Sequence, residues 1–389
     1  MKILIATESF YPNISGVAVF SYNLAKMLAQ NGHELYVIAP STNGDFYFEK
    51  IDQIKIYRLK SRQNPWRKGH FISKAPFKKV AQIINEVKPD VIHLQDPAAI
   101  SLATLLVARR QKIPVVVTNH FSLDYVVSYL KWLKPIHFVI RFILNTYLGW
   151  FYNRAQVLTC PSKQIADYFT DRHLKSKPIV ISNGVDLGRF MPEYGDRESV
   201  LNQWKIPANK SILLYVGRLD VDKNIEILLR ALPKVLAKKQ IQLLLVGEGK
   251  IMNQMKDLVK ELKIEPNVTF TGQIDNQNNN LPKIYQVAAI FINPCPIETQ
   301  GIAVLEAMAS GLPIVAANGG ALPELIKDSE NGYLFKSDDS ADLAQKIIQI
   351  LSDSKLAQKM GQKSLEIVEA HKVENTFKEF EKIYEGLKK

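Results

Sequence analysis

Short aliphatic runs alternate with segments of helical period along most of the chain. In the first half the aliphatic runs lie at 2–7, 34–39, 54–59, 90–94, 114–118, 156–160 and 178–181. Segments such as 19–31 and 98–111, whose apolar residues recur every three or four positions, separate several of these runs. This alternation predicts a mostly parallel sheet with helices on both faces.

The same pattern begins again in the second half. Further aliphatic runs lie at 211–216, 241–246, 268–271, 289–293 and 313–317. Before them comes a polar stretch, 192–198, which is typical of a linker. We therefore expect an α/β protein with two doubly wound, Rossmann-like domains, 1–190 and 191–372, which face a central cleft at the carboxyl ends of their strands.

The last segment, 373–389, predicts an amphipathic helix. Five large apolar residues fall on one of its faces: Phe377, Phe380, Ile383, Tyr384 and Leu387. A helix with such a face needs a partner surface to cover.

The composition is that of a soluble globular protein, with 47% apolar and 23% charged residues among 389. Cys160 and Cys295 are the only cysteines, too few for a disulfide framework and too far apart for a metal-binding cluster of their own. No apolar run predicts a signal peptide or a membrane span. We expect a protein of the reducing cytoplasm.

Positive charge is concentrated in the first half of the chain. Residues 1–190 carry 25 Lys and Arg against 12 Asp and Glu, whereas residues 191–389 carry 25 against 26. Between positions 60 and 79, cations alternate with aromatic and aliphatic residues, a pattern suited to an anionic membrane surface. The membrane contacts expected from this segment are Arg62, Trp66, Arg67, Lys68 and Lys74.

A second basic and aromatic run, 131–154, fits either a membrane-surface helix or a buried helix with solvated ends. Nucleic acid is the other partner that a basic half suggests. No zinc-ligand spacing, helix-turn-helix signature or RNA-recognition motif accompanies the charge, so we expect no nucleic-acid partner.

Two loops carry features of a phosphate site. The loop after the first strand ends at Gly16, which opens a helix whose free N–H groups favour an anion. The run from Gly217 places Arg218 and Lys223 after a strand, where they could clamp a diphosphate as a fork and a point charge. Without further context, an ordinary turn and solvated loop charges would explain both.

The segment 293–316 is the most informative, because it reads strand, loop, helix, turn, strand. Glu298 lies in the loop, Gly301 would let a ligand approach the backbone, and Glu306 lies on the helix. A carboxylate such as Glu306 can accept two hydrogen bonds from a vicinal diol, for example a ribose, and Glu298 could hold sugar hydroxyls in the same way.

With Asn183-Gly-Val-Asp186 and Gly319-Gly-Ala-Leu-Pro-Glu324, these motifs resemble the retaining glycosyltransferases of family four over essentially the whole chain. The resemblance implies the GT-B fold, with the last helix crossing back onto the first domain. It also implies donor-binding roles: phosphate for Gly16, diphosphate for Arg218 and Lys223, transferred sugar for Glu298, ribose for Glu306, and donor oxygens for the backbone at Gly301 and Ile302.

His120, which follows a strand of the first domain, matches the active-site histidine of that family. The catalytic residues implied are His120, Arg218, Lys223 and Glu298. Asp124 and Tyr125 are implied as contacts of the acceptor.

Within the family, Glu298-Thr-Gln-Gly301, Ile14-Ser-Gly-Val17 and Asp124-Tyr125 are most similar to bacterial diacylglycerol glucosyltransferases. The resemblance implies hexose transfer from UDP-glucose to a lipid hydroxyl, such as that of diacylglycerol, at the cytoplasmic membrane face. It implies retention by front-face attack, with no metal and no cofactor.

Three alternatives remain at this stage. The enzyme could use GDP-mannose or another UDP-sugar, with phosphatidylinositol or a polyprenyl-linked glycan as acceptor. It could act on a soluble acceptor, as glycogen- or sucrose-type enzymes do. A nucleotide-sugar-binding protein without catalysis is the third, and the complete set of motif residues argues against it.

Overall fold

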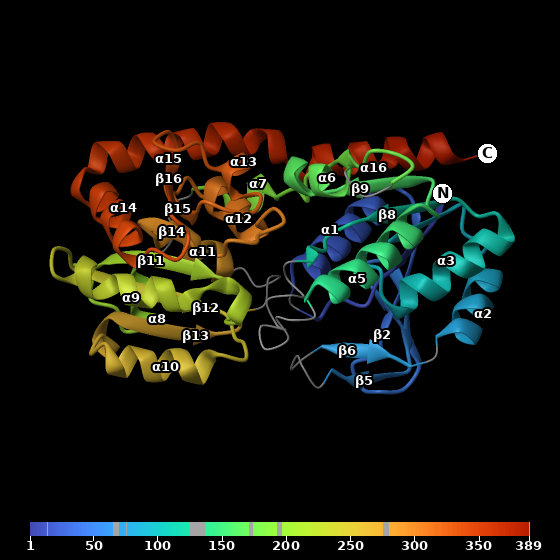
Figure 1. Ribbon diagram of the computed structural model, residues 1–389, viewed down its shortest axis with the longest axis horizontal. Coiled ribbons are helices and arrows are strands. Elements are labelled where there is room, and N and C mark those ends of the chain that lie inside the picture. The colour runs from blue at the N-terminus through green and yellow to red at the C-terminus, as the bar shows by residue number, and fades with distance from the viewer. Residues whose placement is uncertain are drawn as a thin grey trace. The chain divides into compact units, whose positions relative to one another are not determined.

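The computed structural model describes residues 1–13, 15–64, 70–74, 76–123, 137–170, 174–192, 197–274 and 280–388. The chain forms two compact units, each with its own sheet and core (Figure 1). Unit 1 comprises Met1–Asn183 and Glu374–Lys389, and unit 2 comprises Gly184–Val373.

The boundary follows Asn183, whereas the sequence analysis places it at 190. The difference arises because Val185 and Phe190 are buried in the core of unit 2. The Phe190 ring meets Tyr285 edge to face, with 5.5 Å between the ring centroids. The segment that the sequence assigns to the first domain, including the short helix α7 (Leu187–Phe190), therefore belongs to unit 2.

Unit 1 is built on an eight-stranded sheet in the order β10-β9-β8-β7-β1-β2-β4-β3. Its strands pair in parallel except β3, which runs antiparallel to β4 at the edge. The strands are β1 (Lys2–Ala6), β2 (Glu34–Pro40), β3 (Tyr47–Ile51), β4 (Ile54–Leu59), β7 (Val91–Leu94), β8 (Val115–Thr118), β9 (Val157–Cys160) and β10 (Ile179–Val180). A separate hairpin joins β5 (Ser61–Gln63) to β6 (Phe71–Ser73).

Helices cover both faces of this sheet. They are α1 (Gly16–Gln30), α2 (Phe77–Val87), α3 (Ala99–Gln111), α5 (His137–Tyr152), α6 (Lys163–Thr170) and α16 (Val373–Leu387). Leu4 and Ala6 of β1 pack in the core that α2, α3 and α5 share, while Ile3 and Ile5 are buried on the opposite side. Because successive side chains of a strand point to opposite faces, the aliphatic run of β1 is buried on both.

The final helix, α16, completes the core of unit 1. Phe380 and Tyr384 are fully buried, and the Phe380 ring lies 5.8 Å from that of Phe20 in α1. The Tyr384 hydroxyl and Nδ1 of His93, on β7, lie 2.6 Å apart. The predicted amphipathic helix thus covers the sheet face that α1 also covers.

Unit 2 has a six-stranded parallel sheet in the order β13-β12-β11-β14-β15-β16. Its strands are β11 (Ser211–Val216), β12 (Ile241–Val246), β13 (Val268–Gly272), β14 (Ile290–Asn293), β15 (Ile314–Ala317) and β16 (Gly332–Phe335). Its longer helices are α8 (Arg197–Gln203), α9 (Ile225–Leu236), α10 (Met252–Glu261), α11 (Asn280–Val287), α12 (Ile302–Ala309), α14 (Ser340–Ser352) and α15 (Ser354–Val368).

The predicted architecture, two doubly wound α/β domains, is confirmed. The sequence analysis did not predict β3, β5, β6 or β16. No helix in the described parts of the chain is both long and apolar enough to cross a membrane. Cys160 and Cys295 are free thiols, and both are buried.

Candidate active site

In unit 1, the loop after β1 leads to the start of α1 at Gly16. The Ser15 hydroxyl caps this helix by accepting a hydrogen bond from the Ala18 N–H, and it lies 2.6 Å from the Ser9 hydroxyl. Gly16 is therefore the first residue of a fifteen-residue helix. Its position at the positive end of the helix dipole is compatible with an anionic ligand.

His120 lies just beyond β8, at the same edge of the sheet. Its ring packs against Phe20, and its Nε2 lies 3.0 Å from the amide oxygen of Gln95. Burial lowers the pKa of His120 to about 3, so the imidazole is neutral at physiological pH. With the Gln95 oxygen facing Nε2, that nitrogen carries the proton and Nδ1 is the hydrogen-bond acceptor.

Gln95 was not found by the sequence analysis. It follows β7 directly and is fully buried, and its Nε2 has no hydrogen-bond partner among the residues that the structure describes. Only the fold brings it to His120, which lies 25 positions further along the chain. In a single sequence, nothing marks a glutamine after a strand as a site residue.

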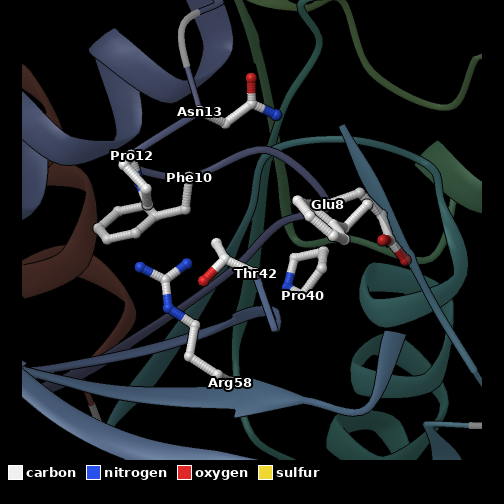
Figure 2. A pocket seen from close by; sticks show the side chains of 8 residues that line it. Glu8, Phe10, Pro12, Asn13, Pro40, Thr42 and Arg58 are labelled. Atoms are coloured by element: carbon white, nitrogen blue, oxygen red, sulfur yellow. The ribbon is translucent and has the colours of Figure 1, made fainter. Parts of the chain in front are cut away.

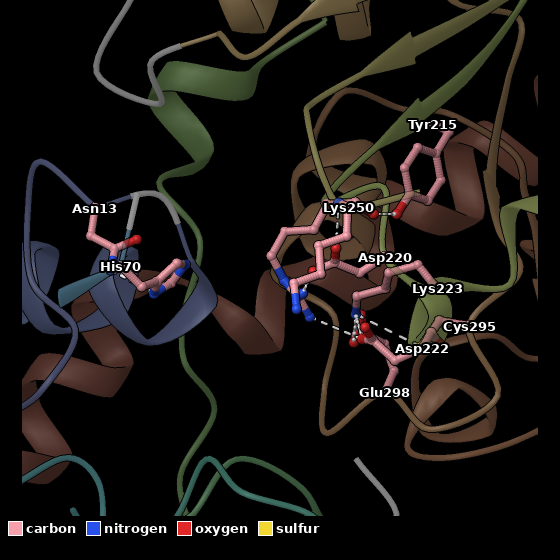
Figure 3. A network of polar contacts seen from close by, with 10 residues as sticks. Asn13, His70, Tyr215, Asp220, Asp222, Lys223, Lys250, Cys295 and Glu298 are labelled. Carbon is pink, nitrogen blue, oxygen red and sulfur yellow. Dashed lines mark hydrogen bonds and ion pairs between the residues drawn. The ribbon is translucent and has the colours of Figure 1, made fainter. Parts of the chain in front are cut away.

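In unit 2, the loop after β11 brings the two predicted cations together with carboxylates. Figure 3 shows Lys223 beside Asp222 and Glu298. Arg218 forms ion pairs with Asp220 and with Asp222, the latter at 2.9 Å. Nζ of Lys223 lies 2.6 Å and 3.1 Å from the two carboxylate oxygens of Glu298. Three of the predicted residues, Arg218, Lys223 and Glu298, thus lie in one cluster.

The cluster keeps Lys223 positively charged. Burial opposes the charge, but the carboxylates of Glu298 and Asp222 favour it, and the pKa of the ammonium lies well above its usual range. Burial also raises the pKa of the Cys295 thiol to about 12. The thiol is therefore neutral, and the cation at this site is a permanent one.

The loop that carries Glu298 depends on two glycines. Gly301 precedes α12 with a φ of +95°, which side chains with a Cβ rarely adopt. A Cβ at Gly320 would lie 2.5 Å from the Glu298 carbonyl oxygen and 2.6 Å from its nitrogen. The backbone at Gly320 therefore packs directly against Glu298, and Ile302 begins α12 beside it.

Glu306 lies inside unit 2, on α12. It is buried, and its Oε2 accepts a 2.7 Å hydrogen bond from the hydroxyl of Tyr285, on α11. Burial, followed by the charge of Glu306, raises the pKa of Tyr285 well above its usual range, so the tyrosine remains a donor. The sequence analysis found Glu306 but missed Tyr285, which lies 21 positions earlier on another helix.

Several predicted residues fall outside the described ranges: Trp66, Arg67, Lys68, Asp124 and Tyr125. Of the predicted membrane contacts, Arg62 on β5 and Lys74 after β6 are both exposed. No group of three or more His, Cys, Asp and Glu side chains in the described ranges is arranged to hold a metal ion.

Exposed aromatic residues accompany the cations of unit 1, and two of them, Phe46 and Phe48, lie outside the basic runs that the sequence analysis identified. Phe46, Phe48 and Phe77 are between 42% and 53% exposed, and the Lys79 ammonium lies 3.9 Å from the centre of the Phe46 ring. On α5, Phe138 and Phe142 are 80% and 64% exposed. The first unit thus presents rings as well as cations to its surroundings.

Comparison with known proteins decides the family. Residues 14–189 match the profile of Glycosyltransferase Family 4, and residues 196–366 match that of Glycosyl transferases group 1. An uncharacterized glycosyltransferase of Methanocaldococcus jannaschii is 30% identical over 366 residues, which cover 91% of this chain and 90% of that protein. The chain is a family 4 glycosyltransferase.

Two further likenesses concern the sequence and the fold. The glycosyltransferase is 28% identical over 361 residues to the alpha-monoglucosyldiacylglycerol synthase of Streptococcus pneumoniae, covering 90% of this chain and 78% of that protein. Sucrose-phosphate synthase from Thermosynechococcus elongatus has the same fold, with a TM-score of 0.80 at 23% identity over 100% of this chain and 99% of that one. The glycosyltransferase therefore has the predicted GT-B architecture.

Proposed function

We propose that this glycosyltransferase moves a hexose, glucose from UDP-glucose, to the hydroxyl of a membrane lipid such as diacylglycerol, with retention of the anomeric configuration. The observation that carries the proposal is the half-buried cluster of Arg218, Lys223 and Glu298 at the carboxyl end of β11. The likeness to an alpha-monoglucosyldiacylglycerol synthase supports the choice of donor and acceptor.

The cluster suits a diphosphate because ion pairs with carboxylates fix the positions of its two cations. Phosphate oxygens compete with Asp220 and Asp222 for Arg218, and with Glu298 for Lys223. When the diphosphate takes Lys223, the Glu298 carboxylate is released and can accept hydrogen bonds from the sugar. One exchange of partners thus prepares both the leaving group and the sugar.

Neutralisation of the departing diphosphate would supply most of the catalysis. Arg218, Lys223 and the N-terminus of α12 at Ile302 provide positive charge for this, and we propose that no metal ion or cofactor is required. In the proposal, the neutral imidazole of His120 accepts a hydrogen bond from the donor sugar at Nδ1, and the Glu306 carboxylate holds the ribose.

Membrane association is part of the proposal, and it places the enzyme at the cytoplasmic membrane face. The basic stretch with Arg62 and Lys74, and the exposed rings of Phe46 and Phe77, combine headgroup-binding cations with groups that enter the acyl boundary. An anionic surface would attract the first unit, which holds the excess of positive charge.

The test is a product assay on anionic vesicles containing diacylglycerol, with EDTA present. UDP-glucose, UDP-galactose and GDP-mannose are supplied in separate reactions, and the lipids are identified by mass spectrometry. We expect an α-linked glucosyl-diacylglycerol, whose anomeric configuration is read by NMR. Product formed with another donor would overturn the choice of UDP-glucose. Product formed only with added metal would overturn the proposed metal independence, and a β-linked product would overturn retention.

A matched pair of variants ties the activity to the cluster. Lys223→Met should lower kcat/KM by at least 100-fold, whereas Lys238→Met, which changes an exposed lysine after α9, should leave it unchanged. Equal activity in the two variants would remove Lys223 from the mechanism.

A further inference from the structure

Unit 1 contains a pocket of about 160 Å³ beside the loop that follows β1 (Figure 2). Its walls are mostly apolar, formed by Phe10, Pro12, Pro40 and Phe71. Phe10 and Pro40 are buried at its base, whereas Pro12 and Thr42 are exposed at its mouth. The pocket lies at the carboxyl end of the β1 strand, only a few residues before Gly16.

One side of the pocket offers hydrogen-bond donors without surplus positive charge. Arg58 is 1% exposed, its Nε donates a 2.7 Å hydrogen bond to Glu49, and one terminal nitrogen donates to the Tyr11 carbonyl. Figure 2 shows the terminal nitrogens directed toward Phe10 and Thr42. Because Glu49 already balances the guanidinium, this wall suits a carbonyl or hydroxyl oxygen better than a phosphate.

The opposite wall also disfavours an anion. The Glu8 carboxylate turns away from Thr42 and Pro40 and accepts backbone hydrogen bonds from Ser73 and Ile100. Its chain lines the pocket, and burial together with the charge of Asp96 raises the pKa of Glu8 to about 7. The wall is therefore neutral or negative around physiological pH, never positive.

The volume limits what can enter. A protein cavity of roughly 150 Å³ holds benzene, a molecule of six heavy atoms. A glyceryl group also has six heavy atoms, three carbons and three oxygens, whereas a hexose has twice as many. The pocket therefore has room for a glyceryl group, whereas a sugar ring is larger than this volume and would extend beyond the mouth.

We propose that this pocket holds the glyceryl part of a neutral glycerolipid acceptor. The inference rests on the proposed transfer to a lipid hydroxyl, and it restricts the acceptor from lipids in general to neutral glycerolipids. Apolar walls contact the carbon skeleton, while Arg58 and Thr42 reach its ester or hydroxyl oxygens. The wall of Glu8 and the paired charge of Arg58 disfavour a phosphate-bearing lipid, and the head of a lipid that already carries a sugar would extend out of the pocket.

Binding of a soluble probe tests the pocket without relying on catalysis. Calorimetry with dihexanoylglycerol, below its critical micelle concentration, compares the full-length wild type with Thr42→Trp, which fills the mouth. The matched control, Thr146→Trp, adds the same ring at an exposed threonine of α5. We expect wild type and Thr146→Trp to bind alike and Thr42→Trp to bind at least tenfold more weakly, with unchanged melting temperatures in all three.

Three results would overturn the inference: no binding by the wild type, equal binding by Thr42→Trp, or tighter binding of hexyl glucoside than of dihexanoylglycerol. Transfer assays separate this inference from the proposed function. If the wild type binds the probe but no sugar nucleotide yields a glycolipid, the function is wrong and the pocket stands. If glucosyl-lipid forms with the same acceptor KM in Thr42→Trp, the function stands and the pocket is wrong.

Discussion

The buried carboxyl of Glu8 makes a quantitative prediction about stability and pH. Burial, reinforced by the charge of Asp96, raises its pKa from 4.5 to about 7. Between these two values the folded protein binds more protons than the unfolded chain does. The free energy of unfolding must therefore fall as pH rises through this interval, and the loss is complete once the pH exceeds the folded-state pKa.

The size of the loss follows from the shift. At about 1.4 kcal/mol per pKa unit, a rise from 4.5 to about 7 corresponds to about 3 kcal/mol. The side chain of Glu8→Gln cannot titrate. It has only one oxygen, so the variant loses the hydrogen bond from the Ser73 N–H or from the Ile100 N–H, and this loss is the same at every pH. The unfolding free energy of the variant, relative to wild type, should therefore rise by about 3 kcal/mol between pH 4.5 and pH 8.

Because a two-domain chain need not unfold in one step, the assay must report on unit 1 alone. Hydrogen exchange of peptides covering β1 and α3, read by mass spectrometry at several pH values and corrected for intrinsic exchange, gives that local free energy. Glu379→Gln on the exposed face of α16 is the matched control and should follow the wild-type profile. Parallel profiles for Glu8→Gln and wild type would refute the reasoning, because they would mean that the pKa of Glu8 is the same in the folded and the unfolded state.

Three further predictions concern the nucleotide site around Glu306 and the basic stretch of unit 1. Glu306→Ala should raise the Kd for UDP at least tenfold, about 1.4 kcal/mol, in calorimetry, and an unchanged Kd would remove the ribose assignment. Tyr285→Phe removes a buried hydrogen bond to a carboxylate and should lower the unfolding free energy of unit 2 by about 1.5–3 kcal/mol. It should weaken UDP binding less than Glu306→Ala does. An equal or larger effect on UDP binding would make Tyr285 a direct nucleotide contact. Replacing the basic residues together, Arg62, Arg67, Lys68 and Lys74, each by glutamine, should reduce sedimentation with phosphatidylglycerol vesicles and spare UDP binding; unchanged sedimentation would mean that this stretch is only a solvated face.

The central strands could be predicted because their chemistry is local. A run such as Ile3-Leu-Ile-Ala6 is apolar at every position, which only a strand covered on both faces requires. β3 gave no such signal, because its sequence, Tyr47-Phe-Glu-Lys-Ile51, is neither a continuous aliphatic run nor an alternation of polar and apolar residues. It is an edge strand without a fully buried position, and it pairs antiparallel with its neighbour. The boundary after Asn183 lies seven positions before the predicted one, because nothing in the sequence shows that the Phe190 ring packs against Tyr285 of unit 2.

The residues of the candidate site also fall into those that the sequence could predict and those that it could not. Lys223 and Glu298 could be proposed from motifs, and the fold brings them to 2.6 Å although 75 positions separate them. Gln95 and Tyr285 could not be proposed, because each matters only through the side chain that it meets, His120 or Glu306. Partners of this kind need tertiary contacts, which a single sequence does not contain.

The position of α16 has a consequence for the order in which the chain can fold during synthesis. Residues 184–373 are complete, and unit 2 can close its core, before α16 has emerged from the ribosome. The first unit, although made earlier, has only α1 on the His93 side of its sheet until Tyr384 is added 291 residues later. A stalled or truncated nascent chain would therefore leave the part of this sheet face that α16 covers exposed, so the oldest part of the polypeptide is the last to complete its core and needs protection by chaperones for longest.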